Sequence, residues 1–188
     1  MSKLILIKHA SPLVDPAKPS DQWKLSEKGR ASCDALAIEL ASHRLTLIVS
    51  SEEPKARETA ELVARKLDVP FETASDLHEH DRSNVAHMRS GDFISMIELM
   101  LRKPDELVLG RETASDALAR FEKAIATVAT THADKNVAIV AHGTVIALFL
   151  AAHGAGKAFD LWRRLGLPSF AVLALPDMKV ESIVERLA

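Results

Sequence analysis

The sequence is short of cysteine and of long apolar runs, and both shortages exclude whole classes of protein. Cys33 is the only cysteine, so no disulfide can form within the chain and no cysteine cage can hold a metal ion. The longest apolar stretch, VAIVAHGTVIALFLAA, is interrupted by His142, Gly143 and Thr144 and is shorter than the roughly 20 residues of a membrane helix. The amino-terminal MSKLILIKHAS has too few apolar residues between its charges for the core of a signal peptide. We therefore expect a cytoplasmic protein with no membrane partner.

An excess of basic residues is also missing. The 24 lysine and arginine residues are outnumbered by 26 aspartate and glutamate residues, which gives a formal net charge of -2. Proteins that bind nucleic acids usually carry a net basic surface, so we expect no nucleic-acid partner. With 188 residues, 47% of them hydrophobic and 27% charged, the chain has the size and composition of one globular domain, residues 1–188. The composition does not indicate an oligomeric state.

Three short apolar runs have the character of buried strands. They are LILIK at 4–8, LTLIV at 45–49 and VAIVA at 137–141. Continuous runs rich in branched residues are typical of parallel strands that are covered on both faces. Near the carboxyl terminus, SFAVLAL and KVESIVERL indicate a final pair of strands joined by a turn.

Helical patterns lie between the apolar runs. Apolar residues recur at helical spacing within 33–40, 60–67 and 117–128. Strands that alternate with helices predict an α/β fold, here three layers, α/β/α, around a mostly parallel central sheet. Residues 76–110 are the least regular part of the chain, and residues 78–110 within them are a candidate lid.

Polar residues follow each of the three strand runs. Lys8 and His9 follow the first run, Ser50 and Ser51 the second, and His142 the third. In open α/β sheets, ligands bind just beyond the carboxyl ends of the strands. If the strands are parallel neighbours, these residues converge on one pocket.

The second of these clusters continues into a helix that suits an anion. The segment SSEEPKARETA places Lys55 and Arg57 in the first turn of this helix. A helix amino terminus attracts anions, and a guanidinium can hold a phosphate with two hydrogen bonds. Two histidines, a lysine and an arginine around one pocket indicate phosphate chemistry, in which histidine can act as a covalent nucleophile.

Several segments, taken in order, also carry a family resemblance. They are LILIKHA, LSEKGRASCDALAIEL, SSEEPKARETA, DLHEHD, GRETASDALAR and VAIVAHGTVI, and together they span residues 4 to about 150. In this order they resemble the motifs of the histidine phosphatase superfamily, also called phosphoglycerate mutase-like proteins. The resemblance implies a three-layer α/β/α fold and a phosphatase.

The resemblance also implies roles for particular residues. His9 would attack the phosphorus and become phosphorylated, while Lys8, Arg57 and His142 would bind the phosphoryl group. Glu79 would protonate the leaving alcohol and then deprotonate the attacking water. The resemblance implies no metal ion and no cofactor. The substrate would be a small phosphorylated molecule or a phosphoprotein.

Three positions depart from the family pattern. Lys8 and Ala10 stand where the signature has arginine and glycine, so the site loses a planar two-pronged donor and gains a methyl group. The residues after Glu79 lack the glycine and tryptophan that often follow the acid in the family. His80 and Asp81 therefore remain candidates to share the role of the acid.

Other interpretations stay open on the sequence alone. The phosphoryl group of a phosphohistidine could pass to a second hydroxyl, as in a mutase, or the site could bind a phosphorylated ligand without turning it over. The cluster HEHD at 78–81 resembles the His-x-His-x-Asp zinc ligands of dinuclear hydrolases. Ser11 and Ser51 are expected to cap or turn the backbone, and Glu112 and Arg120 to be helix-surface or cap residues outside the site.

Overall fold

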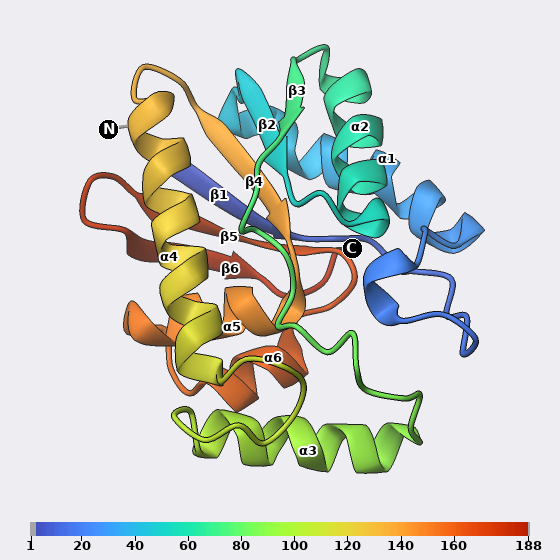
Figure 1. The fold of residues 1–188 in the computed structure, drawn as a ribbon. Coiled ribbons are helices and arrows are strands. Elements are labelled where there is room, and N and C mark those ends of the chain that lie inside the picture. The colour runs from blue at the N-terminus through green and yellow to red at the C-terminus, as the bar shows by residue number, and fades with distance from the viewer. Residues whose placement is uncertain (1–2, 188) are drawn as a thin grey trace.

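The central sheet contains six strands in the order β3-β2-β4-β1-β5-β6 (Figure 1). The structure is a computed structural model that describes residues 3–187. Four neighbouring strands are parallel, namely β3 (Phe71–Thr73), β2 (Leu47–Ser50), β4 (Val137–Ala141) and β1 (Lys3–Lys8). On the other side of β1, the strand β5 (Ser169–Ala174) pairs antiparallel with β1. The strand β6 (Lys179–Val184) in turn pairs antiparallel with β5. The mostly parallel sheet and the final pair of strands are both confirmed.

Helices cover both faces of this sheet (Figure 1). On one face lie α1 (Glu27–Leu40) and α2 (Pro54–Leu67), and on the other lie α4 (Ala114–Thr131) and α5 (Gly143–Ala152). The helix α6 (Ala158–Arg164) packs against α5, and α3 (Ser90–Arg102) packs against α6. Short 3-10 turns occupy Ser20–Gln22 and Ala41–His43. The predicted three-layer α/β/α architecture is confirmed.

The strand β1 alternates between two apolar cores, one on each face of the sheet. Ile5 and Ile7 join the core under α1 and α2, while Leu4 and Leu6 join the core under α4 and α5. All four side chains are at most 1% exposed. Burial of each such side chain stabilises the fold by roughly 1.5–3 kcal/mol. Because both faces are covered, the strand is an uninterrupted apolar run.

Local signals in the sequence fix the starts of α1 and α2. Ser26 is the N-cap of α1, and its Oγ accepts a hydrogen bond from the Gly29 N–H at 3.0 Å. A Cβ on Gly29 would lie 2.1 Å from the Ser11 carbonyl oxygen, so only glycine allows this approach of α1 to the segment after β1. Pro54 occupies the first turn of α2, where its missing N–H costs nothing.

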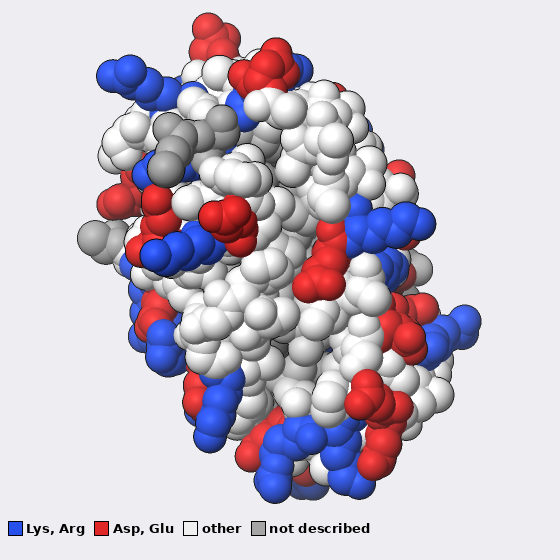
Figure 2. All heavy atoms as spheres, turned by 90° about the vertical axis from the view of Figure 1, so that its left-hand side faces the viewer, with Lys and Arg blue, Asp and Glu red and all other residues white. Residues whose placement is uncertain are grey.

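Three elements, β3, α5 and α6, are not predicted from the sequence pattern. Every residue from Gly143 to Leu150 is buried, so α5 has no polar face that would reveal a helical period. No helix within residues 3–187 is long and apolar enough to span a bilayer. The face shown in Figure 2 carries basic and acidic side chains interspersed around an uncharged centre.

Candidate active site

The polar residues at the strand ends meet at one edge of the sheet. The strand β4 pairs in parallel with both β1 and β2, so the residues that follow the three strands lie side by side. The His9 N–H donates to the Ala141 carbonyl at 3.1 Å, and the Ser51 N–H donates to the Val140 carbonyl at 2.9 Å. As a result, the ring centroids of His9 and His142 are only 5.2 Å apart.

His9 is held as a neutral imidazole with one free nitrogen. Its Nδ1 lies 2.7 Å from the carbonyl oxygen of Ala10. A carbonyl only accepts, so Nδ1 carries the hydrogen and the Nε2 lone pair is free. Burial, together with the nearby His142 and Lys55, holds the pKa of His9 well below its usual value. The unprotonated Nε2 can therefore act as a nucleophile.

His142 is fully buried beside His9. Its Nε2 lies 2.9 Å from the Ser51 hydroxyl and 3.4 Å from the Glu53 carboxylate. Its Nδ1 has no hydrogen-bond partner within residues 3–187. Burial and the Lys55 ammonium lower the pKa of His142 well below its usual value. Burying a polar atom without a partner is costly, so Nδ1 is an atom that a bound ligand would satisfy.

Two lysines supply positive charge at the strand ends. The Lys8 ammonium donates to the Leu165 carbonyl at 2.7 Å, and Lys8 lines a cavity together with His9. Lys55 is 4% exposed and lines a second cavity with His9, and its ammonium contacts the Ser20 carbonyl and the Glu53 carboxylate. Burial lowers the pKa of Lys8 to about 8, although Glu79 acts to raise it.

The placement of Arg57 in the phosphate site requires a correction. Its side chain is 59% exposed and pairs with Glu61 at 3.0 Å, four residues along α2. The two basic residues of the first turn are 200° apart around the helix axis at about 100° per residue, so only one of them can face the strand ends. Lys55, two residues earlier, is the one that does.

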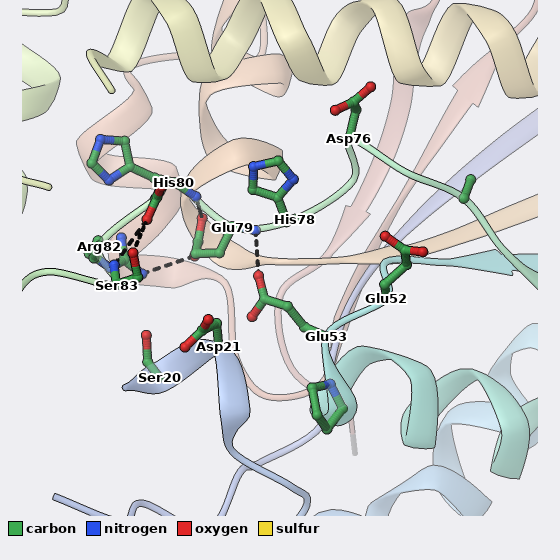
Figure 3. Close-up of a pocket in the computed structure, with 13 residues that line it drawn as sticks. Ser20, Asp21, Glu52, Glu53, Asp76, His78, Glu79, His80, Arg82 and Ser83 are labelled. Carbon is green, nitrogen blue, oxygen red and sulfur yellow. Dashed lines mark hydrogen bonds and ion pairs between the residues drawn. The ribbon is translucent and has the colours of Figure 1, made fainter. Parts of the chain in front are cut away.

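Glu79 brings a buried carboxylate to the start of α5. Its Oε2 accepts from the Thr144 N–H at 3.1 Å and its Oε1 from the Val145 N–H at 3.3 Å. The backbone N–H of Glu79 donates to Glu53 at 2.8 Å, and Figure 3 shows the Glu53 carboxylate pointing toward this segment. Burial acts to raise the pKa of Glu79, but Arg82, His142 and the N–H groups of Thr144 and His80 lower it below its usual range. The carboxylate is ionised in the ligand-free site.

Arg82 is a site residue that the sequence analysis misses. Its Nη1 lies 3.1 Å from the Thr144 hydroxyl and its Nη2 lies 3.3 Å from Glu79. The guanidinium sits 5.3 Å from the centre of the Phe93 ring, within the range of a cation–π contact. Its side chain is 11% exposed and lines the same cavity as Lys8 and His9. The centre therefore contains a guanidinium, supplied by the segment after β3 rather than by α2.

These groups surround a small open site. A cavity of about 310 Å³ is lined by Lys8, His9, Glu79 and Arg82. A cavity of about 410 Å³ also opens onto His9, Glu79 and Arg82 and extends between residues 12–23 and 85–94. An imidazole with a free ring nitrogen, a carboxylate and the cationic side chains of Lys8, Lys55 and Arg82 line these two cavities. This arrangement suits a phosphate ester.

The comparison with protein families agrees with this geometry. The model of the histidine phosphatase superfamily, branch 1, matches residues 4–178. The chain belongs to the histidine phosphatase superfamily. Nothing among the curated proteins matches the chain.

Solved structures of low sequence identity share the superfamily fold. Bacillus stearothermophilus YhfR superposes with a TM-score of 0.78 at 22% identity, covering 98% of this chain and 96% of its own. A mycobacterial glucosyl-3-phosphoglycerate phosphatase gives 0.77 at 20% identity, covering 98% and 99%. The alpha-ribazole phosphatase from Shigella flexneri gives 0.74 at 18% identity, covering 98% and 96%.

Two residues that the sequence analysis leaves outside the site hold its acidic segment in place. The Arg120 guanidinium donates to the carbonyls of Asp76 and His78 at 2.8 and 3.0 Å, and to Glu112 at 2.6 Å. Glu112 in turn accepts from the Asp81 N–H at 2.9 Å. Their side chains are 15% and 17% exposed, so they pack against this loop more closely than free helix-surface residues would. They clamp the backbone on both sides of Glu79 and do not themselves contact His9.

The neighbours of Glu79 have separate partners. The His80 Nε2 lies 2.8 Å from the Glu112 carbonyl, and Asp81 accepts from Ser83 at 2.7 Å. Figure 3 shows the His78 and His80 rings pointing apart. Within residues 3–187, no group of three or more histidine, cysteine, aspartate or glutamate residues is arranged to hold a metal ion.

The departure at Ala10 does not crowd the ligand side of the site. Ala10 is fully buried and belongs to the apolar core under α1 and α2. Its N–H donates to the Thr59 hydroxyl at 3.0 Å. The additional methyl group is thus packed among apolar side chains, and the position of His9 is kept by backbone contacts.

Proposed function

We propose that the protein hydrolyses a phosphomonoester through a phosphohistidine intermediate on His9. The observation that carries this proposal is the hydrogen bond of His9 Nδ1 to a backbone carbonyl, which leaves Nε2 free. Membership of the histidine phosphatase superfamily supports it, as do the phosphatases among the structural neighbours.

In the first step, His9 Nε2 attacks the phosphorus and the bond from phosphorus to the alcohol oxygen breaks. Lys8, Lys55 and Arg82 neutralise the phosphoryl oxygens, which is the main requirement of phosphoryl transfer. The Nδ1 of His142, buried without a partner, is the further donor for these oxygens.

Glu79 supplies the proton that the departing alcohol needs. In the ligand-free site it is ionised because Arg82 and the N–H groups of Thr144 and His80 stabilise its charge. A phosphate dianion that binds Arg82 adds negative charge beside Glu79 and competes with Glu79 for the Arg82 guanidinium. Both effects raise the pKa of Glu79, so substrate binding favours the protonated form of the carboxyl.

In the second step the same carboxylate acts as a base. It takes a proton from water, the hydroxide attacks phosphorus, and the N–P bond breaks to restore neutral His9 and release phosphate. In both steps, side chains of the site neutralise the charges that develop, so the proposed mechanism requires no metal ion.

The test is hydrolysis of p-nitrophenyl phosphate in EDTA by the wild type, His9→Ala and His132→Ala. His132 pairs with Glu72 at the end of α4 and serves as the matched histidine control. We expect activity in the wild type and the control and none in His9→Ala, together with a phosphoryl adduct seen by intact-protein mass spectrometry. Activity that EDTA abolishes, or that survives in His9→Ala, contradicts the mechanism. Absence of both turnover and adduct would instead indicate a phosphate-binding protein.

A further inference from the structure

The larger cavity beside His9 has apolar walls from two distant parts of the chain. Its volume of about 410 Å³ lies within the range of about 300–1,000 Å³ that is usual for small-molecule sites. One wall comes from residues 12–23 and the other from residues 85–94. The apolar side chains that line it include Pro12, Val14, Trp23, Val85, Met88 and Ile94.

Polar side chains also line this cavity, and His9, Lys55, Glu79 and Arg82 among them belong to the reacting centre described above. Glu79 is the one carboxylate among its described lining residues. The Trp23 indole N–H donates to the carbonyls of Asp15 and Lys18, so its polar atom is satisfied within the loop. The side chains of Lys18, His87 and Ser90 lie in exposed positions. A hydroxyl group that leaves water for these walls finds few partners, and an unpartnered buried hydroxyl is costly.

Val14 and Ile94 mark the cavity as a binding surface. Within residues 3–187, neither side chain belongs to the two apolar cores or packs against them, and Val14 is 50% exposed. Both nevertheless line the cavity that opens onto His9 and Glu79. They therefore present apolar surface to whatever is bonded to the phosphoryl group.

We propose that the substrate is the phosphomonoester of an apolar alcohol, whose hydrocarbon part occupies this cavity. The inference rests on the proposed phosphatase function and adds the chemical class of the leaving group. Transfer of each methylene from water into the cavity favours binding by about 4-fold, whereas a hydroxyl at the same place gains no comparable partner.

A pair of substrates with equal numbers of heavy atoms tests the inference. Isopentyl phosphate and glycerol 3-phosphate are both esters of primary alcohols, but one leaving group is a hydrocarbon and the other carries two additional hydroxyls. We expect kcat/KM to be at least about 10-fold higher for isopentyl phosphate. Calorimetry with the His9→Ala variant measures the same preference as binding, independently of turnover.

The variant Val14→Ser/Ile94→Ser and a matched control identify the surface responsible. Leu99 lies on the same helix as Ile94 but is 42% exposed and lies outside the cavity lining. We expect the preference for isopentyl phosphate to fall several-fold in the double variant and to stay unchanged in Leu99→Ser.

The outcomes separate the two proposals. Equal binding of both esters, or a preference for glycerol 3-phosphate, overturns the apolar leaving group even if His9-dependent hydrolysis is present. Tighter binding of isopentyl phosphate without any turnover supports the apolar cavity and counts against the phosphatase. Loss of the preference in Leu99→Ser as well as in the double variant would also overturn the assignment.

Discussion

Lys8 should make anion binding weaken as the pH rises from 7 to 9. Burial lowers its pKa from 10.5 to about 8, against the opposing effect of Glu79. A bound dianion stabilises the ammonium form, so binding to neutral Lys8 must take up a proton. The contribution of Lys8 is therefore nearly complete at pH 7 and is lost as the pH rises through about 8. Lys8 is about 90% protonated at pH 7 and about 10% protonated at pH 9, so affinity should fall about 10-fold.

Calorimetric titration with sulfate measures this fall directly, because sulfate is a dianion throughout the range and needs no turnover. In Lys8→Met we expect weaker binding that no longer changes between pH 7 and 9. In Lys8→Arg, whose charge does not titrate here, the pH dependence should also disappear. The reasoning is refuted if wild-type affinity is the same at both pH values, or if Lys8→Met shows the same decline.

Two further predictions concern the acid and the cations. Glu79→Gln should lower kcat by about 100-fold or more for an alkyl phosphate. The loss should be smaller for p-nitrophenyl phosphate, because its leaving group needs little protonation. An equal loss for both substrates would contradict the role of Glu79 as the acid. Arg57→Ala should leave kcat/KM within about 2-fold of the wild type because the Arg57 side chain is exposed. By contrast, Arg82→Met and Lys55→Met should each lower kcat/KM about 100-fold, because each removes charge-assisted hydrogen bonds. Steady-state kinetics with circular dichroism as a folding control decides between these outcomes.

The sheet and the histidine pair could be predicted because they depend on local pattern. Three branched apolar runs indicated the parallel strands, and the polar residues that follow them had to meet at one edge. His9 and His142 therefore came together as expected. Glu79 also lies at this edge, where it contacts the N–H groups of Thr144 and Val145.

Lys8 follows the first predicted strand, but the other two cations of the site depended on geometry that the sequence does not display. Choosing between Lys55 and Arg57 required the rotation of α2 relative to the strand ends, which depends on how α2 packs. Arg82 sits in a segment without regular periodicity, and only its contacts with Thr144 and Phe93 reveal it. Arg120, which with Glu112 clamps the acidic segment, donates to carbonyls of a loop about 40 residues away. No local sequence pattern predicts a contact over this separation.

The acceptor that orients His9 belongs to the main chain. Many catalytic imidazoles depend on a second side chain for their tautomer, and a single mutation can remove that partner. Here the acceptor is the carbonyl of Ala10, which every amino acid provides. The orientation of the proposed nucleophile is therefore retained when its neighbour is replaced, provided that the backbone keeps its path. In random mutagenesis, activity should therefore be lost through replacement of His9 itself far more often than through loss of the hydrogen bond that orients its ring.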